Sequence, residues 1–346
     1  MKTPQFTPTQ HEFVPFEGGL DTMTPPLRIP PGYVRAAQNY EVSVNGGYSR
    51  IVGYERYDGQ PKPSDAAYAI LTATITGSYA VGNTLTGATS AATGVIIAAT
   101  ATYFVLTKVT GTFQAAEDLQ ISAVTVATAD SAQVTDGAST AKLHAQYKNL
   151  AADEYRDDIA AVPGSGAVRG VVRFNDVLYA FRDNAGGTAT ALYKSSGSGW
   201  TAVSLGRELA FTSGGTTEIA EGDTITGATS GATAVITRVV LQSGSWSAGT
   251  AAGYLIFASQ TGTFQSENLN VGAATNLATI AGNSSAITLS PGGRYEFVRA
   301  NFGGTVNTRR IYGCDGVNLG FEFDGSVYVP IRTGMADDAP LHVAVH

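Results

Sequence analysis

Cysteine and histidine are scarce in this sequence. One cysteine, Cys314, and four histidines occur among 346 residues. A single cysteine cannot form an internal disulfide, so packing and hydrogen bonding must stabilise the fold. Because no histidine is close to Cys314 in the sequence, we interpret it as a buried thiol and not as a nucleophile.

Charged residues are also few. They make up 14% of the chain, against about a quarter in a typical soluble protein. The formal net charge is −7, which gives no bulk electrostatic attraction to nucleic acid. The sparse charge indicates that neighbouring subunits cover much of the surface, although an isolated β surface rich in threonine and serine would have the same composition.

No stretch is long and apolar enough to cross a bilayer. The most apolar one, 94–106, is interrupted by glycine and threonine and falls short of the roughly 20 residues that a spanning helix needs. The opening residues, MKTPQFTPTQHEF, contain prolines and lack the apolar core of a secretory signal. We therefore expect a soluble protein with no membrane span, made and used without Sec export.

Small and turn-forming residues are abundant instead. Glycine alone accounts for 41 residues, and threonine, serine and alanine are frequent. Such a composition favours many short strands over long helices. We expect an all-β fold that consists of partial β-propeller-like blades, two inserted and duplicated small β-sandwich or barrel modules, and an extended proline-rich N-terminal arm.

The predicted arm comprises residues 1–64 and holds nine of the thirteen prolines. Proline removes a backbone donor and restricts the residue before it, so a continuous helix is excluded here. Within the arm, Gly46 and Gly47 separate 39–44 from 48–57, which predicts a β-hairpin. We expect the arm to pack along a larger body or onto a neighbouring chain.

A repeated segment is the clearest feature of the sequence. Residues 82–96 read GNTLTGATSAATGVI and residues 222–236 read GDTITGATSGATAVI, with eleven of fifteen positions identical. In both places a TGTFQ segment follows, and then a glutamate and a leucine, Glu117 with Leu119 and Glu267 with Leu269. Two ordered matching blocks indicate a duplicated domain.

We place the two copies at 65–138, the first module, and 208–290, the second module. The second copy has about eleven more residues around 241–253, which would suit the tip of a hairpin. The shared GATS segment has two interpretations, a glycine loop that holds phosphate or a tight turn before a strand. It lacks the lysine of a P-loop and precedes a β-type run instead of a helix, which favours the turn.

A different pattern lies at 164–207, the first meander, and 291–346, the second meander. Each contains four short apolar runs separated by turn residues, which predicts a four-stranded antiparallel sheet like the blade of a β-propeller. The expected strands are 168–174, 177–182, 189–194 and 200–204 in the first meander, and 295–301, 309–314, 319–323 and 327–331 in the second. A closed propeller needs at least four blades, so either the propeller continues beyond His346 or the two sheets belong to another β architecture.

One helix is expected, at 140–159, because apolar and aromatic residues recur there at close to 3.6-residue spacing. Pro163 and Gly164 follow and end it. The helix belongs to a bridging segment, 139–163, that connects the first module to the first meander. Four carboxylates at 153, 154, 157 and 158 are interleaved with Arg156 and indicate a solvated helix face.

Few residues are arranged for chemistry. His342 and His346 have the spacing of a helical metal pair, but the LHVAVH run alternates like a strand, which would separate them by roughly 13 Å. We predict no catalytic, cofactor-binding or metal site. The residues best suited to a surface or partner contact are Trp246 and Tyr254, aromatic side chains in the extra hairpin of the second module, and packing within that hairpin is the alternative that we favour.

Three segments resemble tail proteins of tailed bacteriophages, in particular nozzle, hub or head-completion proteins that carry a propeller. They are GGLDTMTPPLRIPPGYVRAAQNYEVSVNGGYSRIVGYERYDG (18–59), AVPGSGAVRGVVRFNDVLYAFRD (161–183) and LSPGGRYEFVRANFGGTVNTRRIYGCDGVNLGFEFDG (289–325). The first looks like the N-terminal strand region of those proteins, and the second is similar to the beginning of a blade. The resemblance implies a ring-forming virion component.

Three functions follow from these features. The first is a structural component of a phage tail, a nozzle- or hub-like subunit in a homo-oligomeric ring around the DNA path. Its partners would be adjacent tail or connector proteins, with non-specific contact to translocating DNA, and it would be located in the virion tail after assembly in the host cytoplasm. The alternatives are a receptor- or carbohydrate-binding tail protein that contacts host surface glycans, and a propeller-type glycan hydrolase, which the missing acid/base pair disfavours.

Overall fold

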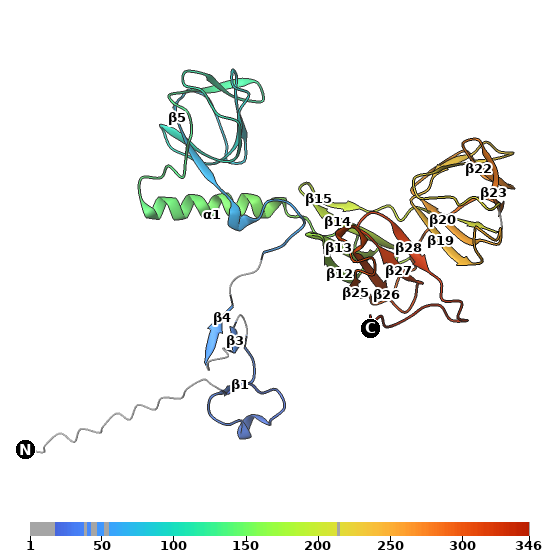
Figure 1. Ribbon diagram of the computed structural model, residues 1–346. Helices are drawn as coiled ribbons and strands as arrows, with labels where there is room; N and C mark the ends of the chain where they lie inside the picture. The colour runs from blue at the N-terminus through green and yellow to red at the C-terminus, as the bar shows by residue number, and fades with distance from the viewer. Residues whose placement is uncertain (1–17, 38–39, 43–46, 52–54, 213–214, 346) are drawn as a thin grey trace, which may run out of the picture. The chain divides into compact units, whose positions relative to one another are not determined.

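The computed structural model describes residues 18–37, 40–42, 47–51, 55–212 and 215–345 (Figure 1). Strands dominate the described residues, where α1 (Ala141–Asp158) is the one α-helix and the only other helices are three short 3-10 turns. The all-β prediction is therefore confirmed. The chain divides into two compact units, Met1–Glu55 and Arg56–His346, each of which is described by itself.

The N-terminal unit contains two small pairs of strands. β1 (Gly19–Leu20) pairs in parallel with β2 (Tyr33–Val34), and β3 (Tyr40–Val42) pairs in antiparallel with β4 (Tyr48–Arg50). The second pair confirms the predicted hairpin, whose turn at 43–46 lies outside the described residues, as does the start of the arm. The Tyr48 hydroxyl donates to the carbonyl of Gly19 at 2.7 Å and so connects β4 to β1.

The predicted arm of residues 1–64 extends past the boundary between the two units, which follows Glu55. Residues 56–64 belong to the larger unit because Asp58 is fully buried there. Its carboxylate accepts hydrogen bonds from the backbone of Gln60 at 2.9 Å and of Ala160 at 3.0 Å. The segment just after Glu55 is therefore held against the end of α1.

The first module is a closed barrel of six antiparallel strands, in the order β10-β9-β6-β7-β8-β5, which β10 closes by pairing with β5. A short seventh strand, β11 (Val134–Thr135), pairs in antiparallel with the first residues of β5. The barrel strands are β5 (Tyr68–Ile75), β6 (Thr84–Gly87), β7 (Thr93–Ala99), β8 (Tyr103–Thr110), β9 (Asp118–Ile121) and β10 (Val124–Ala129). Alternate residues such as Leu85, Phe104 and Leu106 point inward and fill the barrel.

The second module repeats most of these pairings but forms two sheets, β19-β20-β16-β24 and β21-β18-β17-β22-β23. An isolated bridge between Thr212 and Thr279 stands where β5 pairs with β10 in the first module. Its strands are β16 (Arg207–Phe211), β17 (Thr224–Gly227), β18 (Thr233–Val235), β19 (Arg238–Ser243), β20 (Ala252–Phe257), β21 (Gln260–Thr261), β22 (Ser266–Val271), β23 (Ala274–Ala281) and β24 (Ser285–Ala286). β19 and β20 pair as a hairpin around 244–251, which confirms the predicted tip.

The two modules also differ in the strand that forms β7 in the first module. In the first module β7 is continuous and passes a bulge between Ile96 and Ala98. In the second module the equivalent run is divided into β18 and β19 at Ile236 and Thr237. The Ile236 N–H donates to the carbonyl of Asp223, as the Ile96 N–H donates to Asn83 in the first module, and the Thr237 N–H donates to the carbonyl of Ile256. The chain there crosses from one sheet to the other, so the barrel wall is divided.

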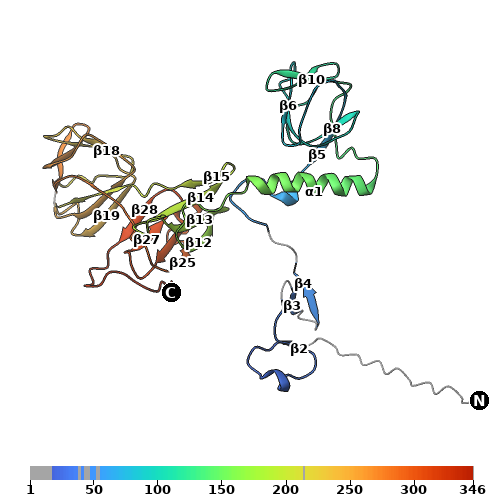
Figure 2. The ribbon, with the colours of Figure 1, turned by 180° about the vertical axis from the view of Figure 1, so that it is seen from behind.

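The predicted helix is confirmed as α1, which lies against the barrel of the first module (Figure 2). Thr140 caps its N-terminus by accepting a hydrogen bond from the backbone of Leu143 at 3.3 Å. Tyr147 and Ala151 form its buried face and pack on residues of β5, β7 and β8, including Tyr68. Burial of this apolar stripe fixes the helix on the outer wall of the barrel.

The two meanders form two four-stranded antiparallel sheets, each with its strands in chain order, and all eight predicted strands are confirmed. The first sheet contains β12 (Val168–Phe174), β13 (Val177–Asp183), β14 (Thr190–Ser196) and β15 (Gly199–Ala202), and the second contains β25 (Glu296–Ala300), β26 (Arg310–Cys314), β27 (Gly320–Phe323) and β28 (Tyr328–Ile331). One aromatic core joins them, in which Phe181 stacks on Tyr295 with ring centroids 4.0 Å apart.

Candidate functional site

The GATS turn of the first module surrounds a buried carboxylate, that of Glu117. The carboxylate accepts hydrogen bonds from the backbone N–H groups of Thr89, Ser90 and Gln114 at 3.1, 2.9 and 2.6 Å, and from the Ser90 hydroxyl at 2.9 Å. Gly87 leaves the necessary room, because a Cβ there would lie 2.6 Å from the Glu117 oxygens. Without these donors, a charged group buried to this degree would be strongly unfavourable.

The second module contains the same arrangement around Glu267. Its carboxylate accepts from the backbone N–H groups of Thr229, Ser230 and Gln265 at 2.7, 2.8 and 3.0 Å, and from the Ser230 hydroxyl at 2.6 Å. Burial opposes ionisation, but these hydrogen bonds outweigh it and lower the pKa of Glu267 to about 2. The pKa of Glu117 is lowered in the same way, against the same burial.

These contacts decide between the two interpretations of the GATS segment. The turn interpretation is confirmed, since each copy lies between two paired strands. The backbone N–H groups of the turn do bind an anion, but the anion is the side chain of Glu117 or Glu267. In the sequence these glutamates are recognisable only as matching positions after the TGTFQ block, and their identical spacing in both copies is the signal of a shared role.

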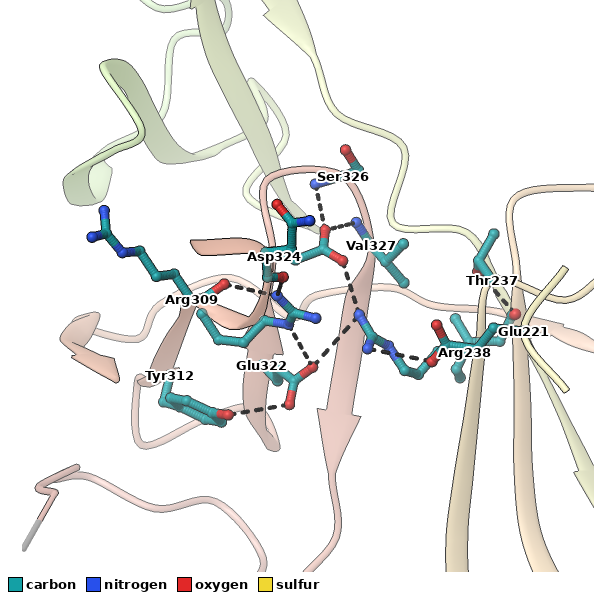
Figure 3. A network of polar contacts seen from close by, with 12 residues as sticks. Glu221, Thr237, Arg238, Arg309, Tyr312, Glu322, Asp324, Ser326 and Val327 are labelled. Carbon is teal, nitrogen blue, oxygen red and sulfur yellow. Dashed lines mark hydrogen bonds and ion pairs between the residues drawn. The ribbon is translucent and has the colours of Figure 1, made fainter. Parts of the chain in front are cut away.

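A second polar site connects the second module to the second meander (Figure 3). Arg238 lies between Glu221 of the module, at 3.3 Å, and two acidic residues of the meander, Asp324 at 2.8 Å and Glu322 at 3.7 Å. The Asp324 carboxylate also accepts two backbone N–H groups in the turn before β28. Arg238 is only 18% exposed, so solvent screens these ion pairs less than it screens pairs on an open surface.

The same junction contains a second arginine, Arg332. It lies 2.7 Å from Glu208 of β16, and its guanidinium is 3.8 Å from the centre of the Tyr254 ring. Arg332 thus makes a cation–π contact and an ion pair at the same time, both with residues of the second module. The second module and the second meander are thus connected by charged groups from both sides.

The residues predicted for a surface contact lie in the second module. Trp246 is 8% exposed and stacks on Phe211 with ring centroids 5.2 Å apart. Tyr254 is half-buried, with Arg332 over one face. Their use by a partner stays a prediction, to which the burial of Trp246 lends no support.

The remaining residues considered for chemistry are dispersed. Cys314 is buried, as predicted, and burial raises the pKa of its thiol. His342 lies 3.0 Å from Glu296, while His346 is outside the described residues. On α1, Glu154 and Asp158 pair with Lys108 of the barrel, so only part of the acidic helix face is free in solvent. No group of side chains in the described ranges has the composition of a metal site.

Within the part of the chain that the structure describes, no helix has the length and apolar character needed to cross a membrane. No family model, curated protein or solved structure matched this chain.

Proposed function

We propose that this chain is a structural subunit of a bacteriophage tail, a nozzle- or hub-like protein that assembles into a homo-oligomeric ring around the DNA path. The observation that carries the proposal is the packing of the two meanders through one aromatic core. Neighbouring propeller blades pack in this way. Two of the three segments that resemble phage tail proteins, 161–183 and 289–325, coincide with these two sheets.

In this proposal the two meanders are blades of a β-propeller. Each places a buried aspartate at or just after the end of its second strand, Asp183 and Asp315. Asp183 accepts from Arg169 and Thr190, and Asp315 accepts from the backbone of the turn that follows it. A buried aspartate at a similar position in both sheets supports a common blade design, although the donors that hold it differ. A closed propeller has at least four blades, so its closure requires further sheets of the same kind.

The two modules are, in this proposal, copies of one insert carried by the propeller. The support is the carboxylate cage around Glu117 and Glu267, together with matching strand pairings, since β6 pairs with β7 and β9 as β17 pairs with β18 and β22. We assign the modules to contacts with adjacent tail or connector proteins, and the protein to the virion tail after assembly in the host cytoplasm.

Two measurements test the proposal. Native mass spectrometry and negative-stain electron microscopy of the purified full chain should show a closed homo-oligomer with an open centre. Peptide mass spectrometry of purified phage particles whose genome encodes the chain should detect it in stoichiometric amount. A chain that is absent from the particles would contradict the tail assignment, and a chain that stays monomeric both alone and in the particles would contradict the ring.

A further inference from the structure

One groove of the molecule is rich in arginine. It has a volume of about 680 Å³ and is formed by the ends of both meanders, with Arg173, Arg299, Arg309 and Arg310 in its lining. The whole chain has 21 lysines and arginines and a net charge of −7. Four arginines around a single groove are therefore a local concentration of positive charge on an acidic protein.

The groove is built from one short motif that occurs in both meanders. The motif is VRFN, at 172–175, in the first meander and VRAN, at 298–301, in the second. In each case the first strand of the sheet ends at the residue before the asparagine. Both motifs precede the connection to the second strand of their sheet. Because the two sheets pack together through their aromatic core, the two Arg-x-Asn corners line the same groove.

Two of the four arginines are neutralised by neighbours and two are not. Arg173 pairs with Asp176 at 2.7 Å, and Arg310 pairs with Glu322 at 3.3 Å. Arg299 and Arg309 are exposed, and neither forms an ion pair with any described residue. Figure 3 shows the side chain of Arg309 extending away from the carboxylates of Glu322 and Asp324. The groove thus presents two free guanidinium groups beside two paired ones.

We propose that this groove binds the phosphate backbone of nucleic acid, with Arg299 and Arg309 contacting phosphates directly. Guanidinium groups offer paired N–H donors that match phosphate oxygens. Asn175 and Asn301, which also line the groove, add neutral hydrogen-bond donors of the kind that position a backbone without reading its sequence.

We expect a polyanion and not a single phosphate as the partner, because the free arginines of the groove are few and exposed and would hold an isolated phosphate only weakly. Each phosphate that is neutralised on a nucleic acid releases condensed counterions, and this gain is absent for an isolated phosphate ion. With two to four phosphates contacted, we expect a dissociation constant of about 10⁻⁴ to 10⁻⁶ M and a strong dependence on salt. The choice of DNA as the partner rests on the proposed function. In that function, the groove would be the place where the subunit contacts the DNA.

The test uses the full chain and a fluorescein-labelled DNA duplex of mixed sequence, with fluorescence anisotropy recorded between 50 and 200 mM NaCl. Removal of two phosphate contacts in R299A/R309A should weaken binding about tenfold at the low-salt end and reduce the slope of log K against log salt by about 2. The control K142A/K194A removes two exposed positive charges outside the groove and should bind as the unmodified chain does. Unchanged thermal unfolding shows that each variant is folded.

Three results would overturn the inference. The first is that the unmodified chain at about 100 µM does not bind the duplex in 50 mM salt. The second is that R299A/R309A and the control lose binding affinity equally. The third is that tripolyphosphate displaces the duplex at matched phosphate concentration. The last would identify a small polyphosphate as the ligand of the groove. Ring formation is measured independently. A chain that forms a ring but does not bind DNA would therefore contradict this inference and leave the proposed function intact.

Discussion

Ser230 donates both its backbone N–H and its hydroxyl to the carboxylate of Glu267, at 2.8 and 2.6 Å. In the first module, Ser90 makes the same two contacts with Glu117, both at 2.9 Å. Each carboxylate therefore joins a turn to the start of a strand far along the chain. The hydrogen bonds are charge-assisted, which makes them stronger than neutral ones. In each module a single glutamate closes the turn, so its loss should lower the stability of the whole module.

Replacement of Glu267 by glutamine should destabilise the second module by about 2 kcal/mol, because the neutral amide loses charge-assisted bonds and turns an N–H₂ group toward N–H donors. The chain has two tryptophans, so a W200F background leaves Trp246 as the reporter of this module. Urea unfolding followed by its fluorescence measures the change. Glu218→Gln alters an exposed glutamate and should shift the free energy of unfolding by less than about 0.5 kcal/mol.

The second module should also lose stability in acid. The folded pKa of Glu267, about 2, lies below its ordinary value of 4.5, so the folded state favours the ionised form. The resulting stabilisation is complete above about pH 4.5 and is lost as the pH falls toward 2. Urea midpoints from Trp246 fluorescence at pH 5, 4 and 3 should decrease, and E267Q should show a smaller decrease. An identical pH dependence in both proteins would show that Glu267 is not the group responsible.

Local features were predictable and long-range contacts were not. The strands of the meanders follow from short apolar runs between turn residues, and α1 follows from its apolar spacing, since both patterns are local. The bond from Ser230 to Glu267 joins residues 37 apart, and the pair of Arg238 with Asp324 joins residues 86 apart. No local pattern specifies such partners. The arginine groove could not be predicted from the low overall charge either, because composition does not say where the charged residues lie in the fold.

The core between the two meanders should be intolerant of added volume at Gly170. A Cβ at this position would lie 2.5 Å from the Cβ of Tyr295, which is attached to the backbone and cannot rotate away. Gly170→Ala should push the sheets apart and cost about 1–3 kcal/mol, and near-ultraviolet circular dichroism should report a loosened aromatic core. Gly197→Ala is the matched control, because a Cβ there meets nothing within 4 Å. Equal stability of the two variants would show that the sheets are not in tight contact.

The junction between the second module and the second meander should depend on Arg238. Its removal leaves Asp324, which is 19% exposed, without its cationic partner, and an uncompensated, partly buried carboxylate is costly. Arg238→Ala should therefore destabilise the chain by about 1–3 kcal/mol. It should also uncouple the two parts, because the ion pairs from this arginine reach both of them.

Two single-tryptophan backgrounds make the uncoupling measurable. Trp246 reports the second module, and Trp200, which lies in β15, reports the meanders. In R238A the urea midpoints of the two probes should move apart, since each part then unfolds with less support from the other. Arg156→Ala, which removes an exposed i,i+3 pair on α1, should change stability by less than about 0.5 kcal/mol and leave the midpoints where they are. If R238A behaves like R156A, the ion pairs at the junction do not couple the module to the meander, and the connection then depends on apolar packing alone.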